Sequence, residues 1–295
     1  MRVLVVEAEG LRWRPLYQAQ RVTRLGERQA VAGQLLDGPM RRTVEAVADF
    51  VATARAWSVS EVRVVATSAV REAVNRDDFI ARVRTATGHV VEVVSGEEEA
   101  RLTLQGVAAG LPHLGGSFIL FDIGGGSTEF VLAQDGRAVT AVSLRLGVIP
   151  LAERFVDQGP VSPERFALMR RAVEVRLDRG LPPRLTAARA PGLVGTAGTV
   201  TALAALDLEL PAYDADRVHG HVLRRAAVEG LRLRLGAMTL QRRARLPCME
   251  PGRADVLIPG IAICLSIMER LGHDSLVVSD RGLREGILDG ILSRG

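Results

Sequence analysis

The chain has 295 residues, 47% of them hydrophobic, so it can bury a substantial core in one large domain or two ordinary ones. Its formal net charge is only +4, and no basic run is interleaved with aromatic residues, which argues against a nucleic-acid partner and is compatible with a small, strongly acidic substrate. No apolar run approaches the roughly 18 residues of a membrane span, and no signal-peptide pattern opens the chain. We therefore expect a soluble, cytoplasmic protein with no membrane partner.

The first third of the sequence alternates short apolar runs with amphipathic segments. Such alternation predicts an α/β architecture. The expected elements are strands at 2–7 and 11–21 joined by a turn at 8–10, a helix at 39–56 with an apolar face at Val44, Val47, Phe50 and Val51, a strand at 62–67, a helix at 77–87 and a strand at 90–94.

A helix is predicted to begin at Ser95 with three adjacent glutamates. Ser95 and Glu98 have the spacing of a capping box, and Glu97 precedes Arg101 by four residues, the favourable orientation for an exposed ion pair. Glu99 remains, on a mostly apolar face where a carboxylate is either costly or useful. The alternative is that all three glutamates only interact with the positive end of the helix dipole.

The stretch FILFDIGGGSTEF at 118–130 predicts a strand, a tight turn and a second strand. We expect the glycines at 124–126 to take positive φ and to bring their amide groups close to a ligand, as in an anion site. Asp122 ends the first strand and Glu129 opens the second, and carboxylates suit a divalent cation bound together with phosphate. The alternative is a glycine-rich hairpin turn with a solvated acid on each side.

Two segments of the chain share one pattern. Residues 2–26 and 130–147 each run strand, polar turn, strand and then Arg-Leu-Gly, a weak repeat that suggests two related halves. In the second half a strand and the glycine loop precede this pattern, whereas in the first half Met1 stands where such a loop would end. We therefore expect the natural start to lie upstream of Met1.

The second half of the chain continues with strands and helices. The turn GTAGT at 195–199, between a short strand and a helix, is either a second anion-binding turn or a site of close strand-to-helix packing. His219 and His221 have too few partners for a zinc site, and Cys248 and Cys264 lack metal-ligand spacing and are expected to be reduced, buried thiols. Helices are expected at 162–179, 225–235, 259–271 and 282–292, and a strand at 275–280.

Six segments together resemble, in this order, the motifs of the Ppx/GppA family of exopolyphosphatases and guanosine pentaphosphate phosphohydrolases. They are ATSAVREA at 66–73, SGEEEARL at 95–102, FDIGGGSTEF at 121–130, GTAGT at 195–199, RADVLIPG at 253–260 and SDRGLREG at 279–286. The resemblance covers essentially the whole chain. It implies an α/β fold of the duplicated ribonuclease-H-like type, as in actin-like ATPases and sugar kinases, with an active site in a cleft between two lobes. The implied lobes are 1–114 and 115–295, the last helix packing back on the first lobe.

The resemblance also implies an activity: hydrolysis of the terminal phosphate of inorganic polyphosphate or of guanosine pentaphosphate, with Mg²⁺ as the cofactor. It matches Glu99 to the catalytic glutamate that activates water, and Asp122 and Glu129 to acids linked to magnesium. The opening Asp-x-Gly-Ser/Thr-Asn-Ser/Thr phosphate loop of the family would fall just before Met1. The expected phosphate-binding residues are Thr67, Ser68 and Arg71, then Gly124, Gly125, Gly126, Ser127 and Thr128, then Gly195, Thr196, Gly198 and Thr199.

Two other functions stay open on the sequence. One is a non-catalytic sensor that binds polyphosphate or guanosine tetraphosphate. The other is an ATP-dependent kinase of the same superfamily, although no sugar or acid pocket can be read from the sequence. A homodimer is compatible with the resemblance, since two-lobed members of the family often pair.

Overall fold

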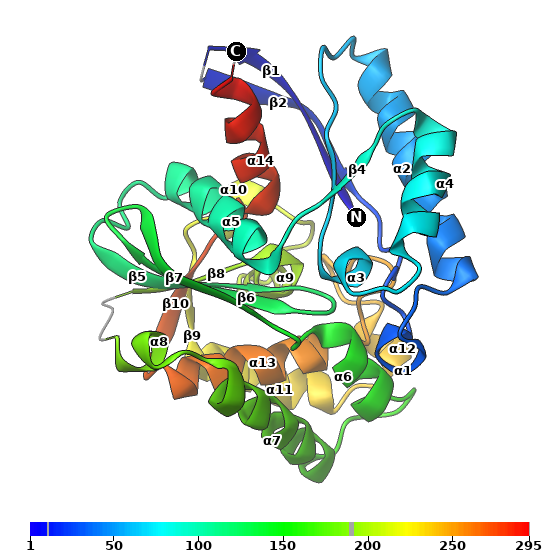
Figure 1. Cartoon of the computed structure of the whole chain (residues 1–295). Coiled ribbons are helices and arrows are strands. Elements are labelled where there is room, and N and C mark those ends of the chain that lie inside the picture. The colour runs from blue at the N-terminus through cyan, green and yellow to red at the C-terminus, as the bar shows by residue number, and fades with distance from the viewer. Residues whose placement is uncertain (11, 189–191, 295) are drawn as a thin grey trace. The chain divides into compact units, whose positions relative to one another are not determined.

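The computed structural model describes residues 1–10, 12–188 and 192–294. Backbone contacts divide the chain into two compact units, which are considered separately below (Figure 1). The first comprises Met1–Glu99 with Ile287–Gly295, and the second comprises Ala100–Gly286. The boundary between residues 114 and 115 that the family resemblance implies stays a prediction.

The first unit contains two separate two-stranded sheets. Strand β1 (Arg2–Glu9) pairs antiparallel with β2 (Arg12–Gln20), which confirms the predicted hairpin; Leu11, the first residue of the predicted second strand, lies outside the described residues. Strand β3 (Val64–Ala66) pairs in parallel with β4 (Val91–Val93). Only Val5 of β1 is buried, so the hairpin contributes little to a core.

Helices supply most of the core of the first unit. The pattern of apolar residues predicted for the long helix is confirmed, because Val47, Phe50 and Val51 are buried and Val44 packs against the same cluster. Its main partner is the amphipathic helix of residues 76–87, which buries Phe79 and Val83. The helices are α1 (Gln29–Ala32), α2 (Asp37–Ala56), α3 (Ser68–Arg71) and α4 (Arg76–Thr87).

The second unit is built on a six-stranded sheet with the order β7-β6-β5-β8-β10-β9. Strands β5, β6 and β7 form an antiparallel meander, β8 runs parallel to β5, β10 runs parallel to β8, and β9 is antiparallel to β10. The strands are β5 (Ser117–Ile123), β6 (Thr128–Gln134), β7 (Arg137–Leu144), β8 (Gly192–Thr196), β9 (Val222–Arg224) and β10 (Ser275–Val278).

Strand β5 is buried on both faces of this sheet. Successive side chains of a strand point to opposite faces. Ile119 and Phe121 accordingly enter the large core, whereas Phe118 and Leu120 pack in a smaller cluster with Leu104 of helix α5 (Gly96–Gly110). Figure 1 shows α5 on one side of the sheet and α7 and α13 on the other. Asp122, one residue beyond Phe121, therefore belongs to the face that α5 covers.

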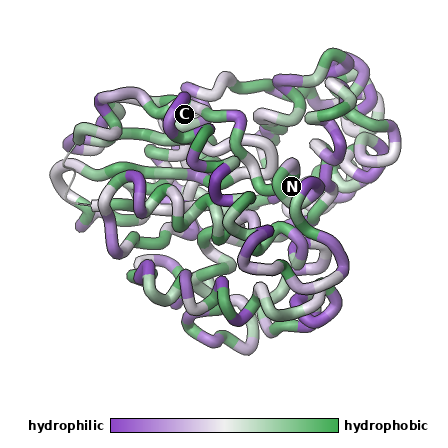
Figure 2. The backbone as a smooth tube through the Cα atoms, turned by 90° about the horizontal axis from the view of Figure 1, so that it is seen from below, coloured by the Kyte–Doolittle hydropathy of each residue, from purple (hydrophilic) through white to green (hydrophobic). Residues whose placement is uncertain are grey.

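The large core is filled by helices, of which α13 is buried along residues 257–268 and is apolar on every side. Along most of the trace hydrophobic and hydrophilic residues alternate at short intervals (Figure 2). Among the described residues, no helix is both long enough and apolar enough to cross a membrane. The helices after α5 are α6 (Val148–Phe155), α7 (Pro163–Gly180), α8 (Pro183–Ala187), α9 (Ala197–Asp207), α10 (Ala215–Val218), α11 (Arg225–Gly236), α12 (Leu240–Arg243), α13 (Leu257–Arg270) and α14 (Leu283–Leu292).

Candidate functional site

One row of residues crosses four neighbouring strands of the large sheet. The register pairs Ser143 of β7 with Glu129 of β6, Glu129 with Asp122 of β5, and Asp122 with Thr196 of β8. Directly opposed residues project from the same face, with their Cβ atoms about 4.5–5.5 Å apart. The two predicted magnesium ligands, Asp122 and Glu129, are therefore neighbours on one face of the sheet.

This carboxylate pair is an electrostatically unusual arrangement. Glu129 is only 2% exposed, and its Oε1 accepts a hydrogen bond from the Ser143 hydroxyl at 2.7 Å. Like charges directly opposite each other on a sheet repel, and a buried carboxylate requires a compensating partner. A divalent cation shared by Asp122 and Glu129 would offset the repulsion between the two carboxylates. The pair alone could hold it in the manner usual for Mg²⁺, which takes one or two carboxylates and completes its shell with water and substrate phosphate.

The structure offers no larger ligand cluster in the described parts of the chain. Within residues 1–10, 12–188 and 192–294, no group of three or more His, Cys, Asp or Glu side chains is arranged to hold a metal ion. A cation at Asp122 and Glu129 would therefore need ligands from water or substrate. This is the coordination expected of a magnesium ion that arrives with a phosphate chain.

The glycine loop follows Asp122 as predicted, but its glycines are required for a reason other than positive φ. Neither Gly124 nor Gly125 lies in the left-handed region, so that expectation is wrong for these two residues. Glycine is required here by close packing. A Cβ on Gly125 would lie 3.0 Å from Cδ1 of Ile149, and a Cβ on Gly147 would lie 2.2 Å from the carbonyl oxygen of Gly125. The loop and the start of α6 therefore fit together with no room for side chains.

Two backbone amides of the loop have no partner in the described structure. The Gly124 N–H donates to the carbonyl oxygen of Ser127 at 2.9 Å, which closes the turn. The next two residues, Gly125 and Gly126, are exposed, and neither amide donates a hydrogen bond within the described residues. Of the loop glycines, these two are the ones whose amides are available for an anion.

The second glycine-rich turn lies beside the first. The Thr199 hydroxyl is 3.4 Å from the carbonyl oxygen of Ile123, the residue immediately before Gly124. Ala197, at the centre of GTAGT, has a φ of 70°. An alanine in the left-handed region is strained, and such strain tends to be found at functional sites. Because β5 and β8 are parallel, both turns occupy the carboxyl edge of the sheet, where α/β proteins bind their ligands.

Besides Thr199, two more of the expected phosphate-binding side chains are engaged with protein carbonyl groups. The Thr128 hydroxyl donates to Leu146 at 2.5 Å. The Thr196 hydroxyl lies 3.0 Å from the carbonyl oxygen of Ser279 and 2.9 Å from that of Arg281. These two threonines therefore tie the glycine turns to neighbouring segments. Any contact that they make with phosphate would have to come from their backbone amides.

Sequence reasoning missed Arg253 as a site residue. A Cβ on Gly198 would lie 1.9 Å from Nη1 of Arg253, so the guanidinium group rests directly on the second glycine turn and requires glycine at 198. Arg253 is also ion-paired with Glu250. The only available signal was its place in the RADVLIPG motif, which carries no spacing rule that links it to GTAGT.

The candidate residues of the first unit meet through one arginine. Arg71, on α3, donates from Nη1 to the carbonyl oxygen of Val94 at 2.9 Å and to Oε2 of Glu99 at 3.1 Å. Glu99 is 7% exposed, and the expectation that it sits on a buried face of its helix is confirmed. Thr67 is the N-cap residue of α3 and Ser68, its first residue, is buried, so three of the predicted first-unit residues belong to one short turn.

The capping interaction predicted at the start of α5 is present. The Ser95 hydroxyl accepts a hydrogen bond from the Glu98 amide at 3.1 Å. The Glu99 amide donates to the carbonyl oxygen of Ser95 at 2.9 Å. Because this cap fixes the first turn of the helix, it also fixes the direction in which Glu99 leaves the backbone.

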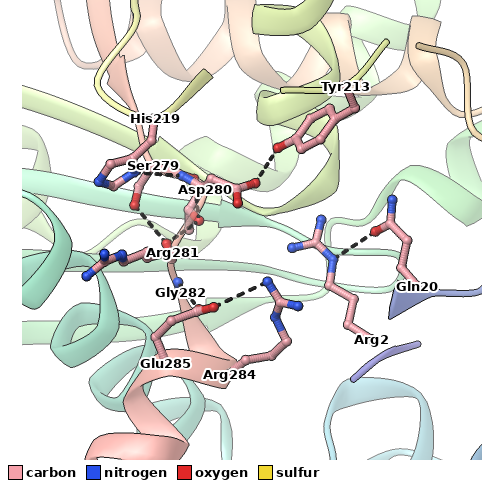
Figure 3. Close-up of polar contacts among 11 residues, drawn as sticks. Arg2, Gln20, Tyr213, His219, Ser279, Asp280, Arg281, Gly282, Arg284 and Glu285 are labelled. Atoms are coloured by element: carbon pink, nitrogen blue, oxygen red, sulfur yellow. Dashed lines mark hydrogen bonds and ion pairs between the residues drawn. The ribbon is translucent and has the colours of Figure 1, made fainter. Parts of the chain in front are cut away.

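The SDRGLREG segment forms a polar junction within the second unit (Figure 3). The Asp280 amide donates to Nδ1 of His219 at 3.2 Å, which leaves Nε2 of the imidazole to donate to the carbonyl oxygen of Gly110 at 2.9 Å. The Asp280 carboxylate accepts a hydrogen bond from the Tyr213 hydroxyl, and Glu285 accepts one from the Gly282 amide at 2.7 Å. Both ring nitrogens of His219 are therefore used to join neighbouring segments.

Comparison with known proteins shows the family to which this chain belongs. The model of the Ppx/GppA phosphatase family matches residues 4–295. The chain belongs to the Ppx/GppA phosphatase family. It is 35% identical over 284 residues to exopolyphosphatase 2 of Mycobacterium tuberculosis, covering 92% of this chain and 88% of that protein. It is 30% identical over 292 residues to exopolyphosphatase 1 of Mycobacterium leprae, covering 98% and 85% of the two chains.

Solved structures of the family have the same fold. The Ppx/GppA family member from Aquifex aeolicus is 30% identical and superimposes with a TM-score of 0.81 over 99% of this chain and 94% of its own. An exopolyphosphatase from Cytophaga hutchinsonii, 24% identical, gives 0.91 with the same coverage and shows the fold alone. The predicted α/β class is confirmed.

Proposed function

We propose that this Ppx/GppA phosphatase family member hydrolyses the terminal phosphoanhydride bond of inorganic polyphosphate. The observation that carries the proposal is the cross-strand pair of Asp122 and Glu129, set in the row of residues between two glycine turns. A carboxylate pair of which Glu129 is buried, beside free backbone amides, suits a magnesium-bound phosphate chain. The mycobacterial relatives, both named exopolyphosphatases, support polyphosphate as the substrate class.

The second unit supplies electrostatic stabilisation in this proposal. Asp122 and Glu129 would hold Mg²⁺, which when bound neutralises charge on phosphate oxygens. The free amides of Gly125 and Gly126 would donate to the oxygens of the transferred phosphoryl group, where negative charge develops. Arg253 would add a fixed positive charge at the second turn. The carboxylates and the glycine amides are held by the backbone at one edge of the sheet, so they need little reorganisation during the reaction.

The first unit supplies the base and a phosphate contact. Glu99 would orient and deprotonate the attacking water, and Arg71 would bind the neighbouring phosphate in a bidentate manner. In the structure these two side chains bind each other, with 3.1 Å between Nη1 and Oε2. A phosphate group that engages Arg71 would compete for this ion pair. Substrate binding would thereby release the Glu99 carboxylate to accept a proton from water.

The decisive experiment replaces Glu99 by glutamine, which keeps the shape and removes the base. We expect Glu99→Gln to bind polyphosphate with near-normal affinity and to release phosphate at least about 10²-fold more slowly. Phosphate release from polyphosphate and from guanosine pentaphosphate, followed colorimetrically, checks this and ranks the two substrates. Glu97→Gln, on the exposed side of the same helical turn, is the matched control and should behave as wild type. Unchanged turnover in Glu99→Gln would remove Glu99 from this role.

A further inference from the structure

Helix α7 in the second unit presents three different faces. Phe166, Met169, Val173 and Leu177 are buried in the large core, at the spacing of one helical stripe. The second face carries charges that are paired. Arg170 contacts Glu174 and Glu269, and Asp178 contacts Arg270 at 2.9 Å.

The third face carries arginines without acidic partners. Arg171, Arg176 and Arg179 are exposed, as is Arg154 at the end of α6. In the part of the chain that the structure describes, none of the four lies within ion-pair distance of a carboxylate, in contrast to Arg170 and Asp178 on the second face. The four line one groove of about 500 Å³ together with Phe155, Leu168, Ala172 and Val175.

The groove concentrates positive potential. From Arg171 to Arg179 the helix rises about 12 Å, so the three arginines are staggered along that length of one broad helix face, and Arg154 of α6 lines the same groove. The apolar walls, including Leu168 at 61% exposure and Val175 at 40%, do not screen these charges. A cleft lined by one sign of charge with low-dielectric walls focuses the field and raises the local concentration of counter-ions.

Helix α6 connects this groove to the glycine loop. At its start the Val148 and Ile149 amides donate to the carbonyl oxygens of Gly124 at 3.2 Å and Gly125 at 2.9 Å. At its end Arg154 and Phe155 line the groove, roughly 10 Å further along the helix axis. The groove is thus separated from the proposed phosphoryl site by a single short helix of the same unit.

We propose that this groove is a second anion-binding site, which holds a distal part of a long inorganic polyphosphate chain. The choice of polyphosphate rests on the proposed function; the anionic nature of the ligand rests on the four unpaired arginines. Several guanidinium groups spaced along one groove fit a chain that carries charge on every repeating unit, since each can bind phosphate oxygens in a bidentate manner. A short phosphate compound could not reach both the arginines of the groove and the glycine loop. The groove would therefore favour long chains.

The test compares the double variant Arg171→Gln/Arg176→Gln with wild type on long-chain polyphosphate and on tripolyphosphate. We expect the affinity for the long chain, measured by direct binding, to fall at least about 10-fold, because two charge-assisted contacts are lost. Binding and turnover of tripolyphosphate should not change. The matched control Arg137→Gln/Arg224→Gln removes the same charge from exposed positions of the second unit outside the groove, and should retain long-chain affinity. Arg171→Lys/Arg176→Lys should recover part of the loss.

The possible outcomes separate the two proposals. Equal long-chain affinity in the double variant and wild type would overturn the groove proposal, whatever the activity. Absence of phosphate release from any substrate would defeat the proposed hydrolase function, while a selective loss of long-chain binding would still support the groove. Tighter binding of polyglutamate than of polyphosphate to the wild-type groove would also overturn the proposal, in favour of an acidic protein segment. Unchanged thermal unfolding of the double variant would exclude misfolding as the cause of lost binding.

Discussion

The two units organise their candidate residues in different ways. In the second unit a central strand, β5, has hydrogen-bonded neighbours on both sides, and its register places Asp122 beside Glu129 and Thr196. In the first unit the described strands form two separate pairs, and the candidate residues Arg71 and Glu99 meet through a side-chain ion pair. Backbone register fixes positions that a ligand cannot easily change, whereas an ion pair can open when phosphate competes for its arginine. The rigid unit is therefore suited to hold charge, and the other to respond to substrate.

The largest expected effect is a fall in the rate of phosphate release when one carboxylate of the Asp122 and Glu129 pair is removed. Asp122→Asn keeps the strand register but removes a charge from the proposed cation site. We expect the rate of phosphate release to fall by at least about 10²-fold at a fixed magnesium concentration, with partial recovery as magnesium is raised. A magnesium titration of activity measures both. Asp135→Asn, in the exposed turn after β6, is the control, and asparagine tolerates its φ of 49°. Wild-type magnesium dependence in Asp122→Asn would contradict the role of the pair.

The next effect concerns the packing that holds the glycine loop. In Gly147→Ala the new Cβ would lie 2.2 Å from the carbonyl oxygen of Gly125. Because that oxygen belongs to the backbone, no flexible side chain can move aside to relieve the clash. We expect the free energy of unfolding to fall by about 1–3 kcal/mol, as in other overpacked sites. Urea denaturation measures it. The control is Gly230→Ala in α11, where nothing lies within 4 Å and a gain of about 0.5–1 kcal/mol is expected. Equal stability of the two variants would show that the loop can shift away from α6.

A smaller difference should appear in local stability. Strand β5 is buried nearly throughout and paired on both edges, while β1 has one buried residue and is paired on one edge. Regions with few buried contacts open at lower free energy. We expect amide hydrogens of β1 and β2 to exchange at least about 10-fold faster than those of β5 and β6, a difference of about 1.4 kcal/mol. Equal exchange rates in both sets would mean that the two units open as one.

The smallest expected effect is a difference in labelling rate between the two thiols, both of which lie in the second unit. Burial raises the pKa of Cys264 to about 12 and, to a lesser degree, raises that of Cys248 above the ordinary value of 9.0. A raised pKa reduces the thiolate that reacts with labelling reagents. We expect Cys248 to be labelled first, faster as pH rises, and Cys264 only when the second unit opens. Labelling followed by mass spectrometry measures this. Rapid labelling of Cys264 at neutral pH would contradict the stable core inferred for α13.

The same burial predicts how stability depends on pH. The pKa of Cys264 is higher in the folded protein than the ordinary value of 9.0 that an unfolded chain would have. The folded state therefore holds the proton in a range where the unfolded state releases it. The contribution of this thiol to stability is complete below pH 9 and is lost as pH rises from about 9 to about 12. Cys264→Ser should reduce this alkaline loss in denaturation measured across that range.

The sequence by itself determined the elements and the family. Periodicity located the strands around Asp122, the S-x-x-E spacing located the start of α5, and helix spacing placed Glu99 on a mostly apolar face of that helix. These are local properties, because helix caps, turn glycines and apolar stripes depend on residues only a few positions apart. The motifs then identified the Ppx/GppA phosphatase family because their order spans nearly the whole chain.

Only the tertiary structure decided which of these residues are neighbours. The row of Asp122, Glu129 and Thr196 follows from strand register, and the guanidinium of Arg253 reaches Gly198 from a distant part of the chain. The sequence also gave no means to tell the unpaired arginines of α7 from the paired ones, since pairing depends on carboxylates of other helices such as Glu269. Such contacts are set by the packing of elements far apart in sequence, which no local pattern encodes.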